Sequence, residues 1–199
     1  AFSRVSAGQN FVPTNASDAG WNWGILRKCN ILVQNYKRPQ ISETIKNSYA
    51  VEAYFFRAWF YLDKVQTFGD VPYISKALDN TSEELFGPRQ PRKQVMDSVL
   101  RDIDKAIEYL PATWSTGGRV NKYVALALKS RLCLYEGTYR KYHNLGDFEK
   151  YLNQCVDAST QLMTSGKFSL YKTGNTASDY KTLFVSKDLS TNPEIIFSR

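Results

Sequence analysis

The chain of 199 residues is short of the side chains that most enzymes use for catalysis. Its one histidine, His143, cannot by itself build a multi-histidine zinc site, and no cysteine lies at ligand spacing from it. The adjacent acids Glu83 and Glu84 fall in an expected loop, which does not hold two carboxylates at the separation that glycoside hydrolysis requires. A phosphate-binding glycine loop and a nucleophile elbow are also lacking. We therefore expect no catalytic residues, no metal site and no cofactor, and predict that the protein is not an enzyme.

Cysteine is also scarce, with three residues at widely separated positions. An odd count without close spacing is not a disulfide framework. Cys29, Cys133 and Cys155 all fall in helical patterns, where a thiol usually behaves as a small buried hydrophobe. A bridge between Cys133 and Cys155 is an open alternative, which depends on the separation of their Cα atoms.

Long apolar runs are absent, and none approaches the roughly 18 residues of a membrane span. The first residues do not resemble a signal peptide. The net charge of +7 is spread among acidic residues rather than gathered in one basic patch, so we do not expect nucleic-acid binding. Because the chain stops in the strand-like run 195–199, we expect it to be part of a longer protein.

What the sequence does have is helical periodicity in five segments. Asn121 and Asp147 are favourable N-caps, and Gly69 and Gly166 are favourable stops. The fold class predicted from these patterns is mainly all-α, with antiparallel hairpins in an atypical tetratricopeptide-like arrangement of irregular period and short strand-like pieces near the C-terminus. The helices are expected at Trp21–Tyr36, Ser42–Thr67, Arg92–Leu110, Asn121–Tyr139 and Phe148–Thr164.

The periodicity also predicts which helix faces are buried. The second helix is apolar around most of its circumference, so we expect it to be buried on more than one face, with Trp59 in the core. The predicted buried stripes are Trp21, Ile25, Cys29 and Leu32 or Val33; Ile45, Tyr49, Phe56, Trp59 or Phe60 and Val65; Val95, Val99, Ile103, Ala106, Ile107 and Leu110; Ala125, Leu128, Leu132 and Tyr135; and Leu152, Val156, Ser159 and Met163.

A single domain is expected. Residues 1–17 form an irregular leading segment, residues 18–165 the helical core, and residues 166–199 an irregular tail that leads to a C-terminal part outside this chain.

Several motifs, in a fixed order, resemble those of one family, SusD/RagB. The stretch from Glu52 to Ala58 resembles the family's Glu-Ala-x-Phe-x-Arg-Ala helix, and 68–72 is its Phe-Gly-Asp-Val-Pro turn. Further matches are the Ile-x-x-x-Asn helix at Ile25 to Asn30, the helix ending in Asp102, Ala106, Leu110 and Pro111, the Gly118-Arg119 lead-in to the next helix, and the strand at Asn192 to Phe197.

The resemblance is to the N-terminal helical part of these nutrient-binding proteins. It implies an outer-membrane lipoprotein of Bacteroidetes that is exposed on the cell surface. Such a protein binds oligosaccharide or another nutrient, works with a SusC-like TonB-dependent transporter and performs no chemistry. Two features of the family are absent from this chain: the lipid-bearing N-terminal cysteine and the larger C-terminal half. Contact with the membrane is therefore expected only through a lipid anchor that this chain does not contain.

Tryptophan residues near loops are the candidate ligand contacts, because an aromatic plane packs on the C–H face of a sugar while polar neighbours contact its hydroxyls. We predict ligand binding by Trp21, Asn22, Trp23 and Trp114, with at least one of Trp21 and Trp23 in the core. A structural role is predicted for the motif residues Glu52, Arg57, Gly69, Asp70, Pro72 and Arg119, with Asp70 hydrogen-bonded within its own turn.

Two other functions are compatible with the same patterns. A helical repeat scaffold that binds only proteins has the same fold without a sugar platform. An all-helical carbohydrate-active enzyme requires a carboxylate pair held in a cleft.

Overall fold

The computed structural model describes residues 7–8, 13–16, 19–114, 118–187, 189 and 192–197. The predicted leading segment 1–17 therefore lies largely outside the described residues. Within them the chain forms six α-helices, one 3-10 helix and no strand. The helices are α2 (Gly24–Asn35), α3 (Glu43–Phe68), η1 (Glu83–Phe86), α4 (Arg92–Tyr109), α5 (Lys122–Tyr142), α6 (Phe148–Thr164) and α7 (Asp179–Val185).

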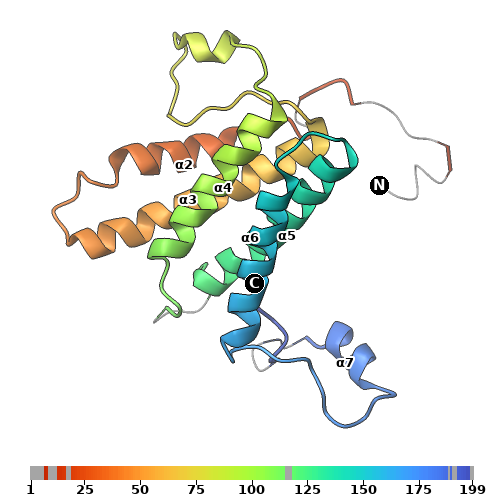
Figure 1. The fold of residues 1–199 in the computed structure, drawn as a ribbon. Coiled ribbons are helices and arrows are strands. Elements are labelled where there is room, and N and C mark those ends of the chain that lie inside the picture. Colours follow the sequence, from red (N-terminus) through yellow and green to blue (C-terminus); the bar gives the residue numbers. More distant parts are fainter. Residues whose placement is uncertain are drawn as a thin grey trace.

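Each of the helices α2 to α5 packs on the next helix along the chain, and α3 also contacts α5 (Figure 1). Figure 1 shows α2 and α3 joined at one end as a hairpin, α4 beside them, and α5 and α6 side by side as the next pair. This arrangement of consecutive helical neighbours confirms the predicted mainly all-α fold with tetratricopeptide-like hairpins. None of the described helices is both long enough and apolar enough to span a bilayer.

The ends of α3 and α5 follow from local chemistry. Ser42 caps α3 by accepting a hydrogen bond from the backbone N–H of Ile45 at 3.4 Å, and Gly69 ends it with φ of 72°. Asn121 caps α5, because its Oδ1 accepts from the N–H groups of Tyr123 and Val124 at 2.9 and 3.1 Å. Both caps satisfy backbone donors that a helix leaves unpaired in its first turn.

Helix α6 has the predicted bounds, but the prediction that Asp147 caps it was wrong. Asp147 makes no side-chain hydrogen bond to the first turn. Its carboxylate instead pairs with Lys93 Nζ at 2.6 Å. The hydrogen bond and charge of Lys93 lower the pKa of Asp147, so this carboxylate ties the start of α6 to α4.

One apolar core runs through the bundle. Its α4 and α5 parts agree with the predicted stripes, because Val95, Val99, Ile103 and Ala106 are fully buried and so is Leu132. The other main members are Leu26, Val51, Phe55, Ala58, Phe60, Tyr61, Leu62, Val65, Val71, Met96, Leu100, Val120, Ala125, Cys133 and Tyr151.

On three helices, part or most of the stripe that was predicted to be buried is exposed. On α3 the side chains of Phe56 and Trp59 are 42% and 46% exposed, whereas Phe55 and Ala58 are buried. The reason is that α3 is apolar nearly all round, so periodicity does not select the face that meets α4. On α2 and α6 the exposed members are Ile25, Leu32, Val156 and Met163, because each of these outer helices buries only a narrow face against one neighbour.

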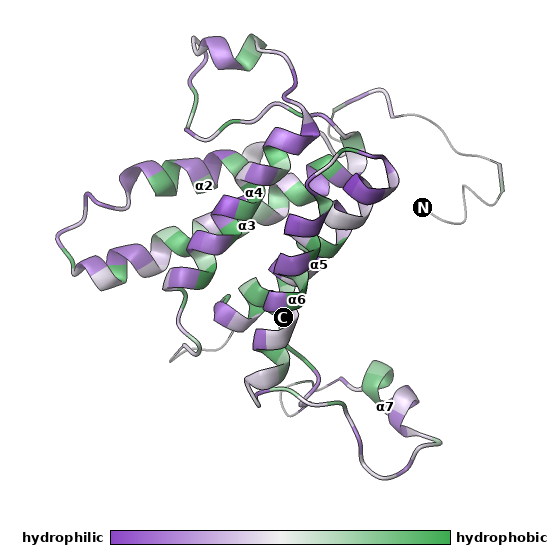
Figure 2. Cartoon of the chain, in the orientation of Figure 1, coloured by the Kyte–Doolittle hydropathy of each residue, from purple (hydrophilic) through white to green (hydrophobic). Residues whose placement is uncertain are grey.

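The tail differs from the predicted strand-like pieces. It contains α7, whose hydrophobic turn stands apart from the bundle in Figure 2. Phe184 and Val185 of this turn are exposed. The segments around Ser169 and Pro193 meet through one backbone hydrogen bond of 3.1 Å, without forming a strand in the part of the tail that the structure describes.

All three cysteines are free thiols, although α5 and α6 are neighbours. Burial is the main cause that raises the pKa of Cys133 to about 12. This thiol is therefore protonated near neutral pH and chemically quiet. Cys155 lies 3.7 Å from the hydroxyl of Ser130. The open alternative of a Cys133–Cys155 bridge is not what the structure shows.

Close packing of α5 on α6 depends on Gly137. A Cβ atom at this position would lie 2.7 Å from Leu152 Cδ2 and 3.2 Å from the backbone nitrogen of Leu152. We expect Gly137→Ala to destabilise the protein by up to about 2 kcal/mol, because overpacking typically costs about 1–3 kcal/mol and alanine recovers about 1 kcal/mol of helix propensity. Chemical denaturation measures the change.

Gly87→Ala is the matched control. A Cβ atom at Gly87 would meet its nearest neighbour at an ordinary 3.5 Å, and its φ is −71°. We expect this variant to stay within about 0.5 kcal/mol of the parent protein. Equal stability of the two variants would show that the α5–α6 contact is looser than described.

Candidate functional site

The connection between α3 and α4 is held at both ends. The backbone N–H of Gln90 donates to the carbonyl of Val71 at 2.9 Å, forming an isolated antiparallel bridge. Asp70 Oδ1 accepts from the backbone N–H of Arg92 at 2.8 Å. The prediction that Asp70 bonds within its own turn was therefore wrong, because its side chain instead caps α4 from across the connection. Pro72 follows in the half-buried extended segment.

Buried polar side chains hold the backbone just after this bridge. Asn30 Nδ2 donates to the carbonyls of Ile74 and Lys76, both at 3.0 Å. The Tyr61 hydroxyl accepts from the N–H of Ile74 at 2.6 Å. Arg57 Nη1 donates to the carbonyl of Ser75 at 3.2 Å. Side chains from α2 and α3 thus fix an extended segment that has no sheet to support it.

Arg57 is the centre of this polar cluster. Its Nε and Nη2 donate to the two carboxylate oxygens of Asp102 on α4 at 2.7 and 2.8 Å, and its Nη1 also donates to Asn30 Oδ1 at 3.0 Å. Only 5% of Arg57 is exposed. Burial acts to lower the pKa of Arg57, but the hydrogen bonds and charge of Asp102 outweigh it and raise this pKa. The guanidinium is therefore a permanent buried cation.

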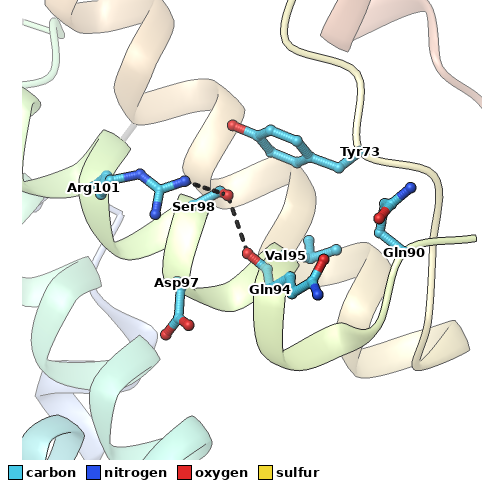
Figure 3. Close-up of a pocket in the computed structure, with 7 residues that line it drawn as sticks. All are labelled: Tyr73, Gln90, Gln94, Val95, Asp97, Ser98 and Arg101. Carbon is cyan, nitrogen blue, oxygen red and sulfur yellow. Dashed lines mark hydrogen bonds between the residues drawn. The ribbon is translucent and has the colours of Figure 1, made fainter. Parts of the chain in front are cut away.

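A groove lies between this fixed segment and α4 (Figure 3). Its volume is about 410 Å³. In Figure 3 the ring of Tyr73 lies across the groove, with Arg101 at one end and the amides of Gln90 and Gln94 at the other. The groove is lined by Tyr73, Gln90, Gln94, Val95, Asp97, Ser98 and Arg101.

Some of the polar groups of the groove are already engaged. Ser98 donates to the Gln94 carbonyl at 3.0 Å and accepts from Arg101 Nη2 at 2.7 Å. Asp97 Oδ1 accepts from the Tyr151 hydroxyl at 2.6 Å and from Arg140 Nη2 at 3.2 Å. The side-chain amides of Gln90 and Gln94 make no hydrogen bond within the described part of the chain and are available to a ligand.

Tyr73 gives the groove its aromatic surface. Burial, followed by the charge of Asp102, raises the pKa of Tyr73, so its hydroxyl stays protonated near neutral pH and can donate a hydrogen bond. Its ring packs against that of Tyr61 at 5.0 Å between centroids. An aromatic plane flanked by free amides and a guanidinium is suited to a polyhydroxylated ligand such as a sugar. Among the described residues, no group of three or more His, Cys, Asp or Glu side chains could hold a metal ion.

The predicted ligand residues Trp21, Asn22 and Trp23 lie outside this groove. The rings of Trp21 and Trp23 meet edge to face at 5.0 Å, and both are half-buried against the core. Trp21 also carries the guanidinium of Arg89 over its ring at 5.1 Å. The two rings are therefore committed to packing on one side, and Asn22 is exposed beside them.

Trp114 lies in a different place. Its Nε1 donates to the carbonyl of Val120 at 2.7 Å, and the guanidinium of Arg119 covers its ring at 3.7 Å. Arg119 Nε in turn donates to Glu52 Oε1 on α3 at 2.9 Å. The structure thus does not bring Trp114 together with the Trp21–Trp23 pair.

Comparison with known proteins agrees with this architecture. The profile of a SusD-like family, described as "Starch-binding associating with outer membrane", matches residues 12–134, more than half of the chain. The chain belongs to the SusD-like family. SusD-like protein P38 of Formosa agariphila is 27% identical over 198 residues, which is 95% of this chain and 35% of that protein.

Solved structures show the same family relationship. A SusD-like protein of Bacteroides fragilis is 28% identical, with a TM-score of 0.74 over 91% of this chain and 33% of its own. A laminarin-binding SusD-like protein shares the fold, with a TM-score of 0.60 and 22% identity over 79% of this chain and 30% of its own. This SusD-like chain thus spans about a third of the length of the relatives it matches.

None of the polar residues that line the groove of the SusD-like chain was predicted as a site residue. Gln94, Asp97 and Arg101 lie outside the predicted buried stripe of α4, where a polar side chain is usually only solvated. Tyr73 follows a proline in a connection, and this position was the one available signal. The groove itself depends on the Val71–Gln90 bridge, which periodicity does not predict.

The outer face of α3 forms a second exposed feature of the SusD-like chain. Trp59 borders a hollow of about 540 Å³ lined also by Asn22, Phe56 and Asp63. On its other side lies a hollow of about 610 Å³, which residues 194–197 help to line. The prediction that Trp59 is a core residue was therefore wrong for this chain.

Proposed function

We propose that this SusD-like chain binds glycan at the bacterial cell surface, in the groove beside Tyr73, without a chemical step. The observation that carries the proposal is the combination of an aromatic ring with the side-chain amides of Gln90 and Gln94, which have no hydrogen-bond partner among the described residues. Sugar sites need both, because the ring covers the apolar C–H face while amides and charged groups contact the hydroxyls. The family description and the laminarin-binding relative support the choice of glycan.

The proposal extends to location and partner. The family profile refers to association with the outer membrane, and SusD-like protein P38 is matched along 95% of this chain. We place the protein on the outer membrane, with a lipid anchor in its parent protein, and propose that it delivers glycan to a SusC-like TonB-dependent transporter. Co-purification of such a transporter from the native membrane is the expected result, and its repeated absence would count against delivery.

Loss of the aromatic surface is expected to weaken glycan binding. Tyr73→Ala removes the ring that faces the groove, and we expect affinity to fall about tenfold, equivalent to about 1.4 kcal/mol. Calorimetry of the intact protein against a panel of oligosaccharides measures this change. Because Tyr73 also packs against Tyr61, the melting temperature is measured in parallel.

Gln94→Ala is a second variant that removes a groove amide from an exposed side chain and is expected to leave stability unchanged. We expect it to weaken binding several-fold, at about 1 kcal/mol for a neutral hydrogen bond. Its matched control is Gln161→Ala, an exposed glutamine on α6. A panel in which no glycan binds would reject the proposed function, and unchanged affinity in both groove variants would reject this groove.

The tryptophan residues give a competing location. We keep Trp21, Asn22 and Trp23 as a proposed second contact region, because Asn22 borders the hollow beside Trp59, and Trp114 as a separate proposed contact. Trp23→Ala and Trp114→Ala measured on the same panel test it. A larger loss of affinity in these variants than in Gln94→Ala would move the site to the tryptophans.

A scaffold that binds only proteins is the second candidate function. It is favoured by the exposed aromatic face of α3, where Phe56 borders one hollow and Trp59 borders two. Trp59→Ala separates the two candidates. If Trp59→Ala loses a protein partner and keeps normal glycan affinity, α3 has a docking role. If the parent protein binds a protein partner but no glycan, the scaffold function replaces the primary proposal.

A further inference from the structure

Arg101 has no acidic partner among the described residues, unlike two basic residues earlier on α4. On the same helix Arg92 pairs with Glu136 at 2.5 Å and Lys93 pairs with Asp147 at 2.6 Å. Arg101 makes one hydrogen bond, to the Ser98 hydroxyl, and forms no ion pair with any acid among the described residues. In Figure 3 its guanidinium points toward Ser98 and Tyr73, into the groove.

The one acid that lines the groove does not neutralise Arg101. Asp97 lies four residues earlier on α4, but Figure 3 shows its carboxylate directed away from the guanidinium. Its Oδ1 is engaged by Arg140 and Tyr151 at 3.2 and 2.6 Å. The charge of Asp97 is therefore balanced from α5, and the groove has an uncompensated positive charge at the Arg101 end.

The unused hydrogen-bond donors of Arg101 also favour an anionic ligand. A guanidinium carries five N–H donors and no acceptor. One of the Arg101 donors is used inside the protein, so its remaining N–H groups face solvent or a ligand. A planar guanidinium binds a carboxylate or a sulfate through two parallel hydrogen bonds, which is stronger than contact with neutral hydroxyls.

We infer that the glycan bound in this groove carries anionic substituents, either carboxylates of uronic acids or sulfate esters, and that Arg101 pairs with one of them. This inference rests on the proposed glycan-binding function and names the substrate class of the same groove. The net charge of +7 on the chain favours it further, because a positive protein attracts polyanions over long range.

The experiment compares three oligosaccharide probes of similar length: a neutral β-glucan, a uronate and a sulfated galactan. Calorimetry with the intact protein is expected to give tighter binding of at least one anionic probe than of the neutral one. Raising sodium chloride from about 50 to about 500 mM is expected to weaken only the anionic complex, because salt screens charge pairs. The uronate and sulfate arms identify which anion is preferred.

Arg101→Gln keeps a polar side chain and removes the charge. We expect it to lower affinity for the preferred anionic probe about tenfold or more and to change neutral binding less than about twofold. The matched control, Arg38→Gln, removes an exposed arginine that follows α2 outside the groove and is expected to leave all affinities unchanged.

Tighter binding of the neutral probe than of both anionic probes overturns the inference and leaves the proposed function intact. An equal loss on all probes in Arg101→Gln also overturns it, since the guanidinium would then act only as a hydrogen-bond donor. Absence of binding to every probe overturns both the inference and the proposed function.

Discussion

Replacing Arg57 by leucine is expected to reduce the free energy of unfolding by about 3–5 kcal/mol, because it leaves the buried Asp102 carboxylate without its partner. Both oxygens of Asp102 accept from Arg57, and Asp102 is itself buried. The same change removes the donors to Asn30 and to the Ser75 carbonyl. Urea denaturation measures the loss, and hydrogen exchange of residues 73–78 is expected to become faster.

The double variant Arg57→Leu with Asp102→Leu distinguishes a charge effect from lost packing. Removing both members of a buried ion pair is often close to neutral, so we expect the double variant to recover about half or more of the lost stability. Arg131→Leu, an exposed arginine on α5, serves as the control and is expected to change stability by less than about 0.5 kcal/mol. A double variant no more stable than Arg57→Leu would mean that the Arg57 contacts with Asn30 and Ser75 dominate.

Arg57 also illustrates what the sequence could predict. A charged side chain inside an aromatic helix needs a partner in the fold, so a structural role was a reasonable prediction that the variants above now test. Its partners were not predictable, because Asp102 and Asn30 lie 45 and 27 residues away. Helix ends were predictable for the opposite reason, since the cap at Asn121 and the stop at Gly69 depend on neighbouring residues alone.

The orientation of α3 shows where sequence reasoning reached its limit. Phe55 and Phe56 are adjacent and chemically identical, yet one is buried and the other exposed. Periodicity identifies a buried face only when the opposite face is polar. The choice between them depends on how α4 and α5 approach, which is a property of the whole bundle. The groove at Tyr73 has the same origin, because it forms where a connection returns to α4 through the Val71–Gln90 bridge.

The second large effect is expected at Glu136, a fully buried acid on α5. Its oxygens accept from Arg92 Nη2 at 2.5 Å and from Arg140 Nε at 2.7 Å, so one carboxylate is hydrogen-bonded to two buried cations. Arg92 has few other partners: its guanidinium covers the Tyr139 ring at 3.3 Å, and its Nε has no acceptor among the described residues. Loss of Glu136 therefore leaves Arg92 unpaired.

We expect Glu136→Leu to cost about 3–5 kcal/mol, as for other buried charges that lose their partner. Glu136→Gln retains the shape and one acceptor oxygen, so a smaller loss of about 1–3 kcal/mol is expected. The control Glu149→Leu removes an exposed acid at the start of α6 and is expected to be nearly neutral. Arg140 keeps Asp97 as a partner at 3.2 Å, which links this cluster to the groove beside Tyr73. If the stability of Glu136→Leu is within about 1 kcal/mol of the parent protein, Asp97 alone can balance the buried cations. The glycan affinity of the same variant then measures whether this change in the partners of Asp97 alters binding in the groove.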